Sequence, residues 1–557
     1  MKKTYLYVFL SCIIFFAGFL RFYRLGDVPI GVHRDEAFLG YNAYSILKTG
    51  KDMNGVPYPL HLKSFLYSPA GYSYASIPFI AAFGLNAFSI RFASALFGTL
   101  TVLIAYFLVK QVFNRTKYSF GIWHSSFGIA EIASLLLALS PWHLNLSRTA
   151  TENTIVVFFI TLGTLLYLLW YKNNRTILLL GSFLSFSITL FIYQAPRAFL
   201  PLFIPILLWA YHRRDIKPFI FFFLTILLPL ILIFRSPMLS LRLNTVSIFS
   251  NAETQLTLDE SLREDGVVNQ STIIARLFHN KAVAYGQLLL QNYFSHFSYP
   301  FLFTDKGLPD RYRIPNQGLL YLIELPLFLA GLYALFKDRK PYSWLLLAWL
   351  FLAPIGSSIA FDDVPNLQRT LLIFPALSIT VALGALKIYT WFKERKNLFI
   401  GLLGYWVIGL LVYGFASYLH SYYIHQPIHR PWSRHEGYQE LVAKVNALVP
   451  QYQQAVVTDR QSAPTIFFLF FGKYDPAKFQ EDTRASSFPD YDRIAFANYE
   501  FSQEECPLRL DQNGVITGRS GILYVNFGTC KPVKEAQELA VIRRGDSSIV
   551  FRILAPQ

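Results

Sequence analysis

Charged residues are scarce in this chain of 557 residues, where Asp, Glu, Lys and Arg together account for 15%. A soluble protein carries about a quarter of its residues as these four types. The hydrophobic fraction is 54% and the mean hydropathy is +0.36. The apolar residues fall in long blocks, such as 154–170 and 219–234, close to the ~20 residues that cross a bilayer. These values exclude an ordinary soluble protein and predict a mainly α, polytopic membrane protein.

Cysteine is also scarce, with three in the whole chain. Cys12 lies in the first apolar segment, whereas Cys506 and Cys530 lie near the C-terminus. If that end of the chain lies outside the cytoplasm, Cys506 and Cys530 are candidates for a disulfide, because oxidising compartments favour one. Two free thiols in a bacterial cell-surface domain are the alternative, since a bond also requires the right distance between the side chains.

The sequence has no continuous basic face of the kind that a nucleic-acid site requires, despite a net charge of +16. The basic residues instead form short clusters between apolar blocks, as in the cytoplasmic loops of membrane proteins. The clusters are Lys110/Arg115/Lys117, Lys172/Arg175, Arg213/Arg214/Lys217, Lys337/Arg339/Lys340 and Lys393/Arg395/Lys396. The positive charge therefore indicates orientation in a membrane rather than nucleic-acid binding.

The N-terminal apolar run lacks a small-residue cleavage site, so we expect a retained anchor rather than a signal peptide. Lys2 and Lys3 precede this run, 4–20, and place the N-terminus in the cytoplasm. About ten further segments have the length and composition of membrane spans. They lie at 90–109, 126–140, 154–171, 176–193, 198–211, 217–234, 319–336, 342–360, 370–389 and 397–418. About eleven spans put every basic cluster in the cytoplasm and the C-terminal region outside.

The spans divide the chain into two expected domains. Residues 1–420 form a transmembrane domain with long external loops at 21–89 and 235–318. The first loop contains half-apolar stretches that suit helices lying at the membrane interface. From 421 to 557 the composition is that of a soluble protein. Its helix and strand patterns predict an extracytoplasmic α/β domain that ends in a hairpin.

The C-terminal patterns place a helix at 439–448, an apolar buried segment at 465–471, and strands at 455–458, 493–497 and 522–527. The second external loop contains an acidic patch at 259–265, followed by an amphipathic run from 273 to about 297.

Ionisable residues are few at the external ends of the spans, so each is a candidate site residue. They are Asp35, Glu36, Lys63, Arg148, Glu152, Arg197, Arg235, His296, Asp362, Asp363 and Arg369. Bundling of the helices would bring them to one outward-facing cavity. A carboxylate there can take a proton from an acceptor, while Arg and Lys stabilise a departing phosphate. The pattern predicts glycosyl transfer from a polyprenyl-phosphate sugar at the bilayer surface.

Several of these residues have a structural alternative. Arg148 and Arg197 can reach lipid headgroups from helix ends, and Glu152 can pair with Arg148 at the i, i+4 spacing. Glu324 is either a cavity residue or a carboxylate satisfied by backbone, which we favour. Glu36 either positions the loop or contacts substrate.

Two patterns resemble metal sites. His425 and His429 have a suitable spacing, but Pro427 interrupts any helix there and favours a domain linker. Asp490 and Asp492 form an Asp-x-Asp string in the soluble domain, away from the other charges, which favours a solvated loop. We expect no metal ligands.

Five ordered motifs resemble the GT-C superfamily of glycosyltransferases, in the branch of the protein O-mannosyltransferases and the aminoarabinose transferases of lipid A. They are His33-Arg-Asp-Glu-Ala-Phe-Leu-Gly-Tyr-Asn42, Leu66-Tyr-Ser-Pro-Ala-Gly-Tyr-Ser-Tyr74, Ile90-Arg-Phe-Ala-Ser-Ala-Leu-Phe-Gly98, Leu139-Ser-Pro-Trp-His143 with Ser147-Arg148, and Tyr193-Gln-Ala-Pro-Arg197. The resemblance covers residues 5–235 well, the later spans loosely and the C-terminal region hardly.

This resemblance implies a GT-C fold and an inverting, metal-independent enzyme that uses a monophosphate lipid donor. It implies that Asp35 is the catalytic base and that Arg148, Tyr193 and Arg197 hold the lipid phosphate. In the family a basic residue often precedes the Pro-x-x-Tyr element. Here Ser68 occupies that place and Lys63 lies five residues earlier, so Lys63 is a weaker candidate for the phosphate.

Two other classes of protein remain as alternatives. A lipid or polysaccharide transporter, or flippase, would show inverted repeats and charges near the bilayer midplane, whereas here the charges lie at one face. A receptor with an external binding domain leaves the loop charges unexplained. We therefore expect a multi-pass cell-membrane glycosyltransferase without a cofactor, whose partners are the bilayer, the lipid-linked donor and a glycan, lipid or protein acceptor.

Overall fold

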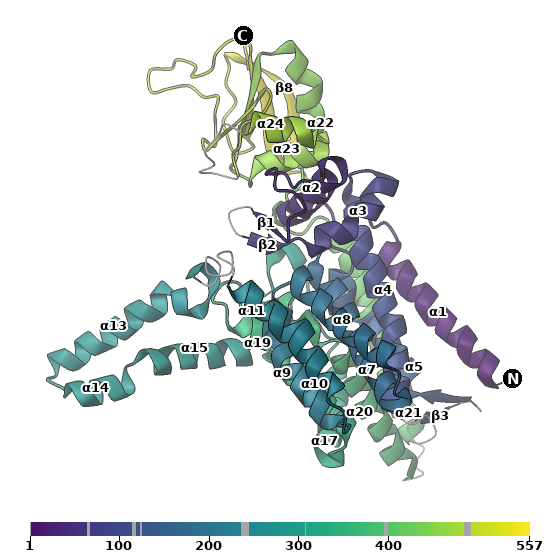
Figure 1. The fold of residues 1–557 in the computed structure, drawn as a ribbon. Coiled ribbons are helices and arrows are strands. Elements are labelled where there is room, and N and C mark those ends of the chain that lie inside the picture. The colour runs from purple at the N-terminus through teal and green to yellow at the C-terminus, as the bar shows by residue number, and fades with distance from the viewer. Residues whose placement is uncertain are drawn as a thin grey trace.

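The computed structural model describes residues 2–63, 67–113, 119–122, 125–235, 244–306, 308–394, 399–483 and 492–557. Figure 1 shows three parts: a bundle of long helices, a C-terminal domain at one end of the bundle, and an arm of helices that leaves the bundle sideways. The N-terminus lies at the side of the bundle and the C-terminus lies in the domain at its end.

Helices occupy the positions of all the expected membrane spans. They are α1 (Lys2–Phe22), α4 (Ala87–Val112), α5 (Ile129–Leu139), α7 (Glu152–Asn173), α8 (Thr176–Ile192), α9 (Ala195–Ala210), α10 (Lys217–Phe222) with α11 (Leu228–Phe234), α17 (Glu324–Asp338), α18 (Pro341–Leu352), α20 (Ala376–Glu394) and α21 (Phe399–His420). Within the described ranges, four helices are long and apolar enough to cross a membrane, namely Ala87–Val112, Glu152–Asn173, Lys217–Phe234 and Gly404–His425. The figure of about eleven crossings therefore stays a prediction.

Prolines shorten two of the expected spans. The segment 342–360 is divided, because α18 ends at Leu352 and Pro354 precedes the short helix α19 (Ile355–Ser358). The segment 370–389 begins as a 3₁₀ turn, Arg369–Ile373, and α20 starts only after Pro375. Proline has no amide hydrogen and clashes with the preceding turn, so it ends a helix on its N-terminal side. Both interruptions leave backbone and side chains free to line a cavity.

Glycines allow α17 and α20 to approach closely. A Cβ on Gly384 would overlap the carbonyl oxygen of Leu327, and one on Gly331 would overlap the carbonyl oxygen of Thr380. Small residues at such crossings let helix backbones meet, which is how helices associate in membranes. At the start of α17, Glu324 accepts a hydrogen bond of 2.9 Å from the backbone nitrogen of Tyr321. This contact agrees with the expectation that the backbone satisfies the carboxylate of Glu324.

The first external loop folds against the end of the bundle. It contains α2 (Arg34–Thr49), the strand pair β1 (His61–Lys63) and β2 (Tyr67–Pro69), and α3 (Gly71–Phe83). The hydroxyl of Ser73 in α3 donates a hydrogen bond of 2.8 Å to the carbonyl oxygen of Leu39 in α2. The strand pair β3 (Ser119–Ile122) and β4 (Ser125–Gly128) lies at the opposite end of the bundle (Figure 1).

The C-terminal domain has a five-stranded mixed sheet in the order β6-β5-β7-β9-β8. The strands are β5 (Gln454–Thr458), β6 (Tyr499–Ser502), β7 (Ile522–Phe527), β8 (Ala536–Arg543) and β9 (Ile549–Pro556), and the helices are α22 (Tyr438–Leu448), α23 (Pro464–Gly472) and α24 (Pro476–Asp482). The first three strands of this order run parallel, and β8 and β9 form the expected terminal hairpin. The expected strand 493–497 is wrong, because the strand lies at Tyr499–Ser502.

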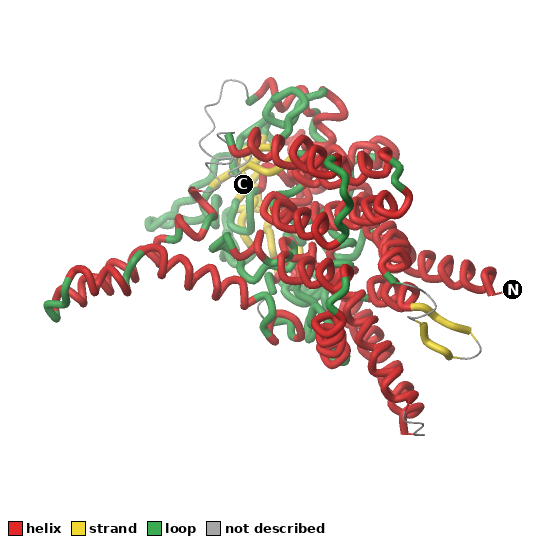
Figure 2. The backbone as a smooth tube through the Cα atoms, turned by 60° about the horizontal axis from the view of Figure 1, so that its bottom comes forward, coloured by secondary structure: helices red, strands yellow, loops and turns green. Residues whose placement is uncertain are grey.

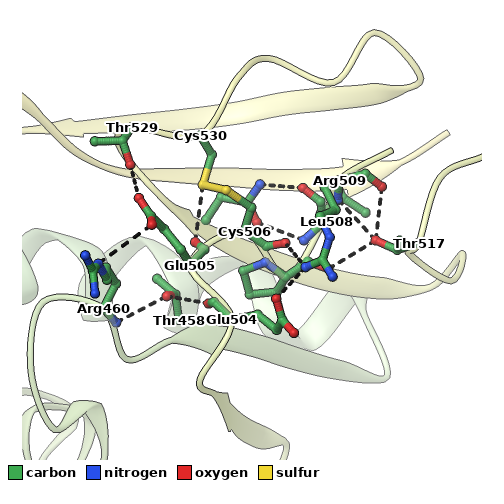
Figure 3. Close-up of a disulfide and its surroundings, with 12 residues drawn as sticks. Thr458, Arg460, Glu504, Glu505, Cys506, Leu508, Arg509, Thr517, Thr529 and Cys530 are labelled. Atoms are coloured by element: carbon green, nitrogen blue, oxygen red, sulfur yellow. Dashed lines mark hydrogen bonds and ion pairs between the residues drawn. A yellow bond between two sulfur atoms is a disulfide. The ribbon is translucent and has the colours of Figure 1, made fainter. Parts of the chain in front are cut away.

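A disulfide joins Cys506 to Cys530, whose Cα atoms are 5.8 Å apart (Figure 3). The alternative of two free thiols is therefore wrong. Next to the disulfide, the carboxylate of Glu505 accepts a hydrogen bond from Thr529 and lies 3.7 Å from Arg460 (Figure 3). The disulfide and the hydrogen bond connect the loop before β7 to the turn after β7, and the ion pair connects it to the segment after β5.

The second external loop forms the arm, which consists of α13 (Ala252–Val267), α14 (Thr272–Phe278) and α15 (Lys281–Ser295). Figure 2 shows the arm extending far from the rest of the molecule. Its base lies beside α19, and the chain returns to the bundle through α16 (Tyr299–Phe303).

Candidate active site

A cavity of about 550 Å³ lies between the start of α2, the loop before the Arg369–Ile373 turn, and the C-terminal domain. Its lining includes His33, Arg34, Asp35, Ser68, Glu152, Tyr193, Arg311, Tyr312, Asp362, Asp363, Asn366, Gln368, Arg369, Trp432, His435, Ser462 and Asp492. These residues come from every segment that we predicted to be external, as the bundling argument required. The cavity combines carboxylates, guanidinium groups and aromatic rings.

Asp35 lies in the first turn of α2 and opens into this cavity. His33 caps the helix, and its Nδ1 lies 3.3 Å from both the backbone nitrogen and the Oδ2 atom of Asp35. The side chain of Asp35 is 63% exposed, so a ligand in the cavity can reach it. Desolvation would raise the pKa of Asp35, but His33, Arg311 and Arg34 outweigh it and hold the pKa below its ordinary value. Asp35 is therefore an ionised carboxylate in the cavity.

Glu36 points the other way and is 4% exposed. Its Oε1 accepts hydrogen bonds from Arg91 Nε at 3.0 Å and from the backbone nitrogen of Ala150 at 2.9 Å. Its Oε2 accepts from Arg434 Nη2 at 2.6 Å and from the backbone nitrogen of His33 at 3.1 Å. Glu36 thus joins α2, α4, the loop before α7 and the C-terminal linker. The structure does not place it at the cavity, which supports a positioning role and not a substrate contact.

Hydrogen bonds of polar side chains hold the loop 362–369 in place. Asp363 Oδ2 accepts hydrogen bonds of 2.9 Å from Arg311 Nη2 and from the Asn366 amide. His296 is 2% exposed, and its Nε2 accepts a hydrogen bond of 3.2 Å from the backbone nitrogen of Asn366, while Nδ1 donates to the carbonyl oxygen of Asn292. Burial lowers the pKa of His296 to about 4. His296 is neutral and lies behind the cavity, so the structure does not bring it to a substrate.

Tyr193 and Arg369 lie where this cavity meets an apolar groove of about 740 Å³, because both residues line both spaces. Arg369 donates to both carboxylate oxygens of Asp362 at 3.1 and 3.2 Å, which fixes its guanidinium. The groove runs between α9, α11 and α19 and is lined mainly by apolar side chains, together with Arg197. Arg197 also donates to the carbonyl oxygen of Leu190 at 3.1 Å.

Glu152 lies at the first position of α7 and lines the cavity. Its Oε2 accepts a hydrogen bond of 2.8 Å from the side-chain amide of Gln368. The helix N-terminus favours a carboxylate at this position. Glu152 therefore adds another carboxylate to the wall of the cavity, besides Asp35 and the Asp residues of the loop 362–369.

Two of the predicted site residues, Arg148 and Lys63, lie outside the cavity. Arg148 is fully buried, and its guanidinium donates to the carbonyl oxygens of Leu20, Arg21, Tyr23 and Val28 and to the hydroxyl of Tyr422. The prediction that Arg148 binds the lipid phosphate is therefore wrong, because its donors satisfy the carbonyls at the end of α1.

Lys63 ends β1 and is not among the residues that line the cavity or the groove. Ser68, which occupies the place of the family's basic residue, does line the cavity.

Sequence reasoning missed Arg311 and the contribution of the C-terminal domain. Arg311 lines the cavity, and its buried Nε has no hydrogen-bond partner within the described segments. Asp492 also lines the cavity, so the interpretation of a solvated loop far from the other charges is wrong for this residue, while Asp490 lies outside the described residues. The clustered Asp310-Arg-Tyr-Arg313 in an external loop was the signal for Arg311.

No group of three or more His, Cys, Asp or Glu side chains that could hold a metal ion occurs in the described part of the chain. The ring of His425 lies against His420, with 3.1 Å between their Nε2 atoms.

Comparisons with known proteins agree with this geometry. Residues 68–240 match the family described as dolichyl-phosphate-mannose-protein mannosyltransferase. A putative mannosyltransferase of Bacillus subtilis, YkcB, is 31% identical over 101 residues, which are 18% of this chain and 12% of that protein.

Three solved structures have a similar fold. ArnT from Cupriavidus metallidurans bound to undecaprenyl phosphate has a TM-score of 0.53 at 12% identity, covering 99% of this chain and 98% of that one. The same protein in its apo state has a TM-score of 0.51 at 11% identity. The apo oligosaccharyltransferase of Archaeoglobus fulgidus has a TM-score of 0.50 at 14% identity, covering 84% of this chain and 64% of that one. The resemblance to the GT-C superfamily of glycosyltransferases is thereby confirmed, and this membrane protein has the GT-C fold.

Proposed function

We propose that the protein is an integral-membrane, inverting glycosyltransferase. It moves a sugar from a polyprenyl-phosphate-linked donor to an acceptor on the extracytoplasmic face of the cell membrane. The observation that carries this proposal is the junction of the apolar groove with the polar cavity at Tyr193 and Arg369. A lipid-phosphate sugar has the same order of parts: an apolar chain, a charged phosphate and a polar sugar.

Each part of the donor has a matching part of the protein. The polyprenyl chain lies in the groove between α9, α11 and α19. The phosphate lies at the junction, where Arg369 is preorganised by Asp362 and Tyr193 lines both spaces. The sugar then enters the cavity that holds Asp35. The similar ArnT structure with bound undecaprenyl phosphate supports a polyprenyl phosphate as the carrier.

The chemical step exchanges one bond at the anomeric carbon. A hydroxyl oxygen of the acceptor forms a bond to this carbon, and the bond from the carbon to the phosphate oxygen breaks. The electron pair of that bond leaves with the polyprenyl phosphate, where Arg369 stabilises the growing charge. The hydroxyl proton passes to the carboxylate of Asp35. Attack from the face opposite the phosphate inverts the configuration, so a β-linked donor gives an α-linked product.

Arg311 supports the same reaction. Its charge helps to keep Asp35 ionised by lowering the pKa of that carboxyl group, and its buried Nε donor has no partner within the described segments. A sugar hydroxyl in the cavity would satisfy that donor, because an unpaired buried donor carries a free-energy cost. We assign Arg311 to sugar or acceptor binding.

The test is glycosyl transfer by the full chain in proteoliposomes. Polyprenyl-phosphate mannose is the first donor to try, in view of the matched mannosyltransferase family, followed by other polyprenyl-phosphate sugars with membrane extracts as acceptor. Release of polyprenyl phosphate and a new glycosidic bond are expected, and Asp35→Asn should abolish both. Asp27→Asn is the matched control, because Asp27 lies in the same loop with a 71% exposed side chain paired to Arg24.

Two outcomes decide the proposal. Retained turnover in Asp35→Asn would remove Asp35 from the reaction. Movement of the donor across the bilayer, with its sugar still attached, would favour a transporter. We further propose that no metal is required, so the rate should not change after treatment with a chelator.

A further inference from the structure

The arm, residues 252–295, carries large apolar side chains with no protein cover. At its far end Ile273 is 84% exposed, Leu277 66% and Phe278 63%. Along α15, Leu290 is 57% and Phe294 63% exposed. The spacing of Val283, Leu290 and Phe294 puts them on one face of α15. A soluble protein rarely leaves so many apolar side chains in water, so this surface has a partner.

The base of the arm is firmly attached to the bundle. The side-chain amide of Asn292 donates to the carbonyl oxygens of Ser358 and Ala360 at 3.3 and 2.9 Å. The hydroxyl of Tyr293 donates to the carbonyl oxygen of Phe351 at 2.8 Å. The far end reaches away from the bundle (Figure 2). The direction of the arm is therefore set by the fold, while the apolar stripe lies outside the protein core.

Charge is divided between the helices of the arm. The helix α13 carries five acidic residues and one basic residue, Arg263; the acidic residues are Glu253, Asp259, Glu260, Glu264 and Asp265. The helices α14 and α15 contain no Asp or Glu and carry Arg276 and Lys281. The acidic residues thus lie on α13, which also exposes Leu256 and Val267, whereas α14 and α15 combine exposed apolar residues with basic ones. This division is typical of helices that lie at a membrane surface, where basic groups meet anionic headgroups.

The arrangement in space agrees with that division. In Figure 1 the acidic helix α13 lies on the side of the C-terminal domain, and α14 and α15 lie on the side of the helical bundle. The arm starts beside α11, whose outer residues Leu232 and Phe234 are 61% and 58% exposed and belong to a helix apolar enough to cross a membrane. Exposed apolar side chains therefore occur both on this candidate membrane span and on the arm that starts beside it.

We propose that the arm is a membrane-interface element that lies in the outer leaflet on the side of the C-terminal domain. The stripe formed by Ile273, Leu277, Phe278, Leu290 and Phe294 enters the acyl boundary, Arg276 and Lys281 meet the headgroup phosphates, and α13 faces water. A second copy of the chain fits less well, because two stripes packed against each other would bring Arg276 and Lys281 of both copies together.

The arm also reaches the wall of the apolar groove. Ala360, which accepts the hydrogen bond from Asn292, lines the groove together with Val246 and Ser247. Contact between the arm and lipid therefore holds this wall at the membrane surface. This consequence stands whether or not the groove takes a polyprenyl chain.

The experiment measures the depth of single fluorophores on the arm. The full chain with Cys12→Ser, which removes the free cysteine in the described residues, is labelled at Leu277→Cys or, as the matched control, at Asp259→Cys on α13. Each protein is placed in nanodiscs of phosphatidylethanolamine and phosphatidylglycerol that hold one copy. Quenching is compared between iodide in water and nitroxide-labelled lipids in the disc.

We expect the label at 277 to be quenched strongly by the lipid nitroxides and several-fold less by iodide than the label at 259. Equal iodide access at the two positions would overturn the proposal. Protection at 277 that appears only when discs hold two copies would show that a second copy, and not lipid, covers the stripe. A third protein, labelled at Phe294→Cys, tests the stripe if the label at 277 prevents insertion.

Discussion

The same chemical change at the neighbouring carboxylates Asp35 and Glu36 should affect different properties of the protein, activity at Asp35 and stability at Glu36. Asp35→Asn and Glu36→Gln each replace a carboxylate by an amide of nearly equal size. Glu36 lies between Arg91 and Arg434, whose side chains are 0% and 3% exposed, whereas Asp35 opens into the cavity. We therefore expect Glu36→Gln to lower the free energy of unfolding and Asp35→Asn to lower activity.

The pKa of Glu36 gives the magnitude. Desolvation would raise this pKa, but the charges of Arg91 and Arg434 outweigh it and lower the pKa from 4.5 to about 2. A difference of about 2.5 corresponds to roughly 3 kcal/mol. Removing one partner of a buried charge pair costs about 3–5 kcal/mol. Because the pKa is depressed in the folded state, this stability is complete above pH 4.5 and is lost as the pH falls towards 2.

Asp35 should contribute much less to stability. Its neighbours also depress its pKa, but its side chain is 63% exposed and water screens the interaction. Exposed ion pairs contribute about 0–1 kcal/mol. Asp35→Asn should therefore unfold within about 1 kcal/mol of the unmodified chain, while its transfer rate falls by about 10²-fold or more.

The assay is denaturant unfolding of the detergent-solubilised full chain, followed by tryptophan fluorescence at neutral and acidic pH. Glu36→Gln should be less stable by about 3–5 kcal/mol at neutral pH, and the difference should shrink near pH 3. Equal stability of Glu36→Gln and Asp35→Asn at neutral pH would refute the division of roles between the two residues. A loss of stability in Glu36→Gln that does not depend on pH would show that packing, and not charge, stabilises the surroundings of Glu36.

Three further predictions concern the cavity and the C-terminal domain. Arg369→Gln should lower kcat/KM for the lipid donor by about 10–100-fold, because a charge-assisted hydrogen bond contributes about 1.5–3 kcal/mol; an unchanged value would place the phosphate elsewhere. Burial lowers the pKa of His296 to about 4. The dependence of the transfer rate on pH between 6 and 8 should therefore be the same for the unmodified chain and His296→Gln. A change of rate in this pH range that only the unmodified chain shows would contradict a neutral, structural histidine. Cys530→Ser opens a loop of 24 residues and should destabilise the C-terminal domain by about 3 kcal/mol, measured as a lower unfolding midpoint that reductant reproduces in the unmodified chain.

The sequence predicts the helices well because hydropathy alone decides them. A membrane-spanning segment must be long and apolar, and the structure has a helix at each expected position. The site is predicted in part for a similar reason. Asp35, Glu152 and Arg369 are charged residues at the ends of helices that we predicted to be external. Burying a charge in or near a membrane costs free energy, so such residues are rare and indicate a site. All three line the cavity.

Arg148 shows why the same reasoning fails elsewhere. It also lies at an external helix end, yet its donors satisfy carbonyl oxygens at the end of α1 and the hydroxyl of Tyr422, 274 residues away. No local pattern distinguishes an arginine that binds a ligand from one that satisfies orphan helix carbonyls. The difference depends on which loop packs beside it, and that is a property of the tertiary structure.

The C-terminal domain is part of the cavity and is not merely attached to it. Ser462, Ala463 and Asp492 line the wall opposite the membrane bundle, and Arg434 brings the linker into the buried charge cluster of Glu36, 398 residues away in sequence. Gly31 makes this approach possible, because a Cβ there would lie 2.5 Å from the carbonyl oxygen of Arg434. Removal of the domain would therefore leave Glu36 and Arg91 with an incomplete ion cluster and would open the cavity to water. Asp35, the proposed base, lies next to this cluster and is held in place by contacts from both ends of the chain, so its environment is a property of the whole protein.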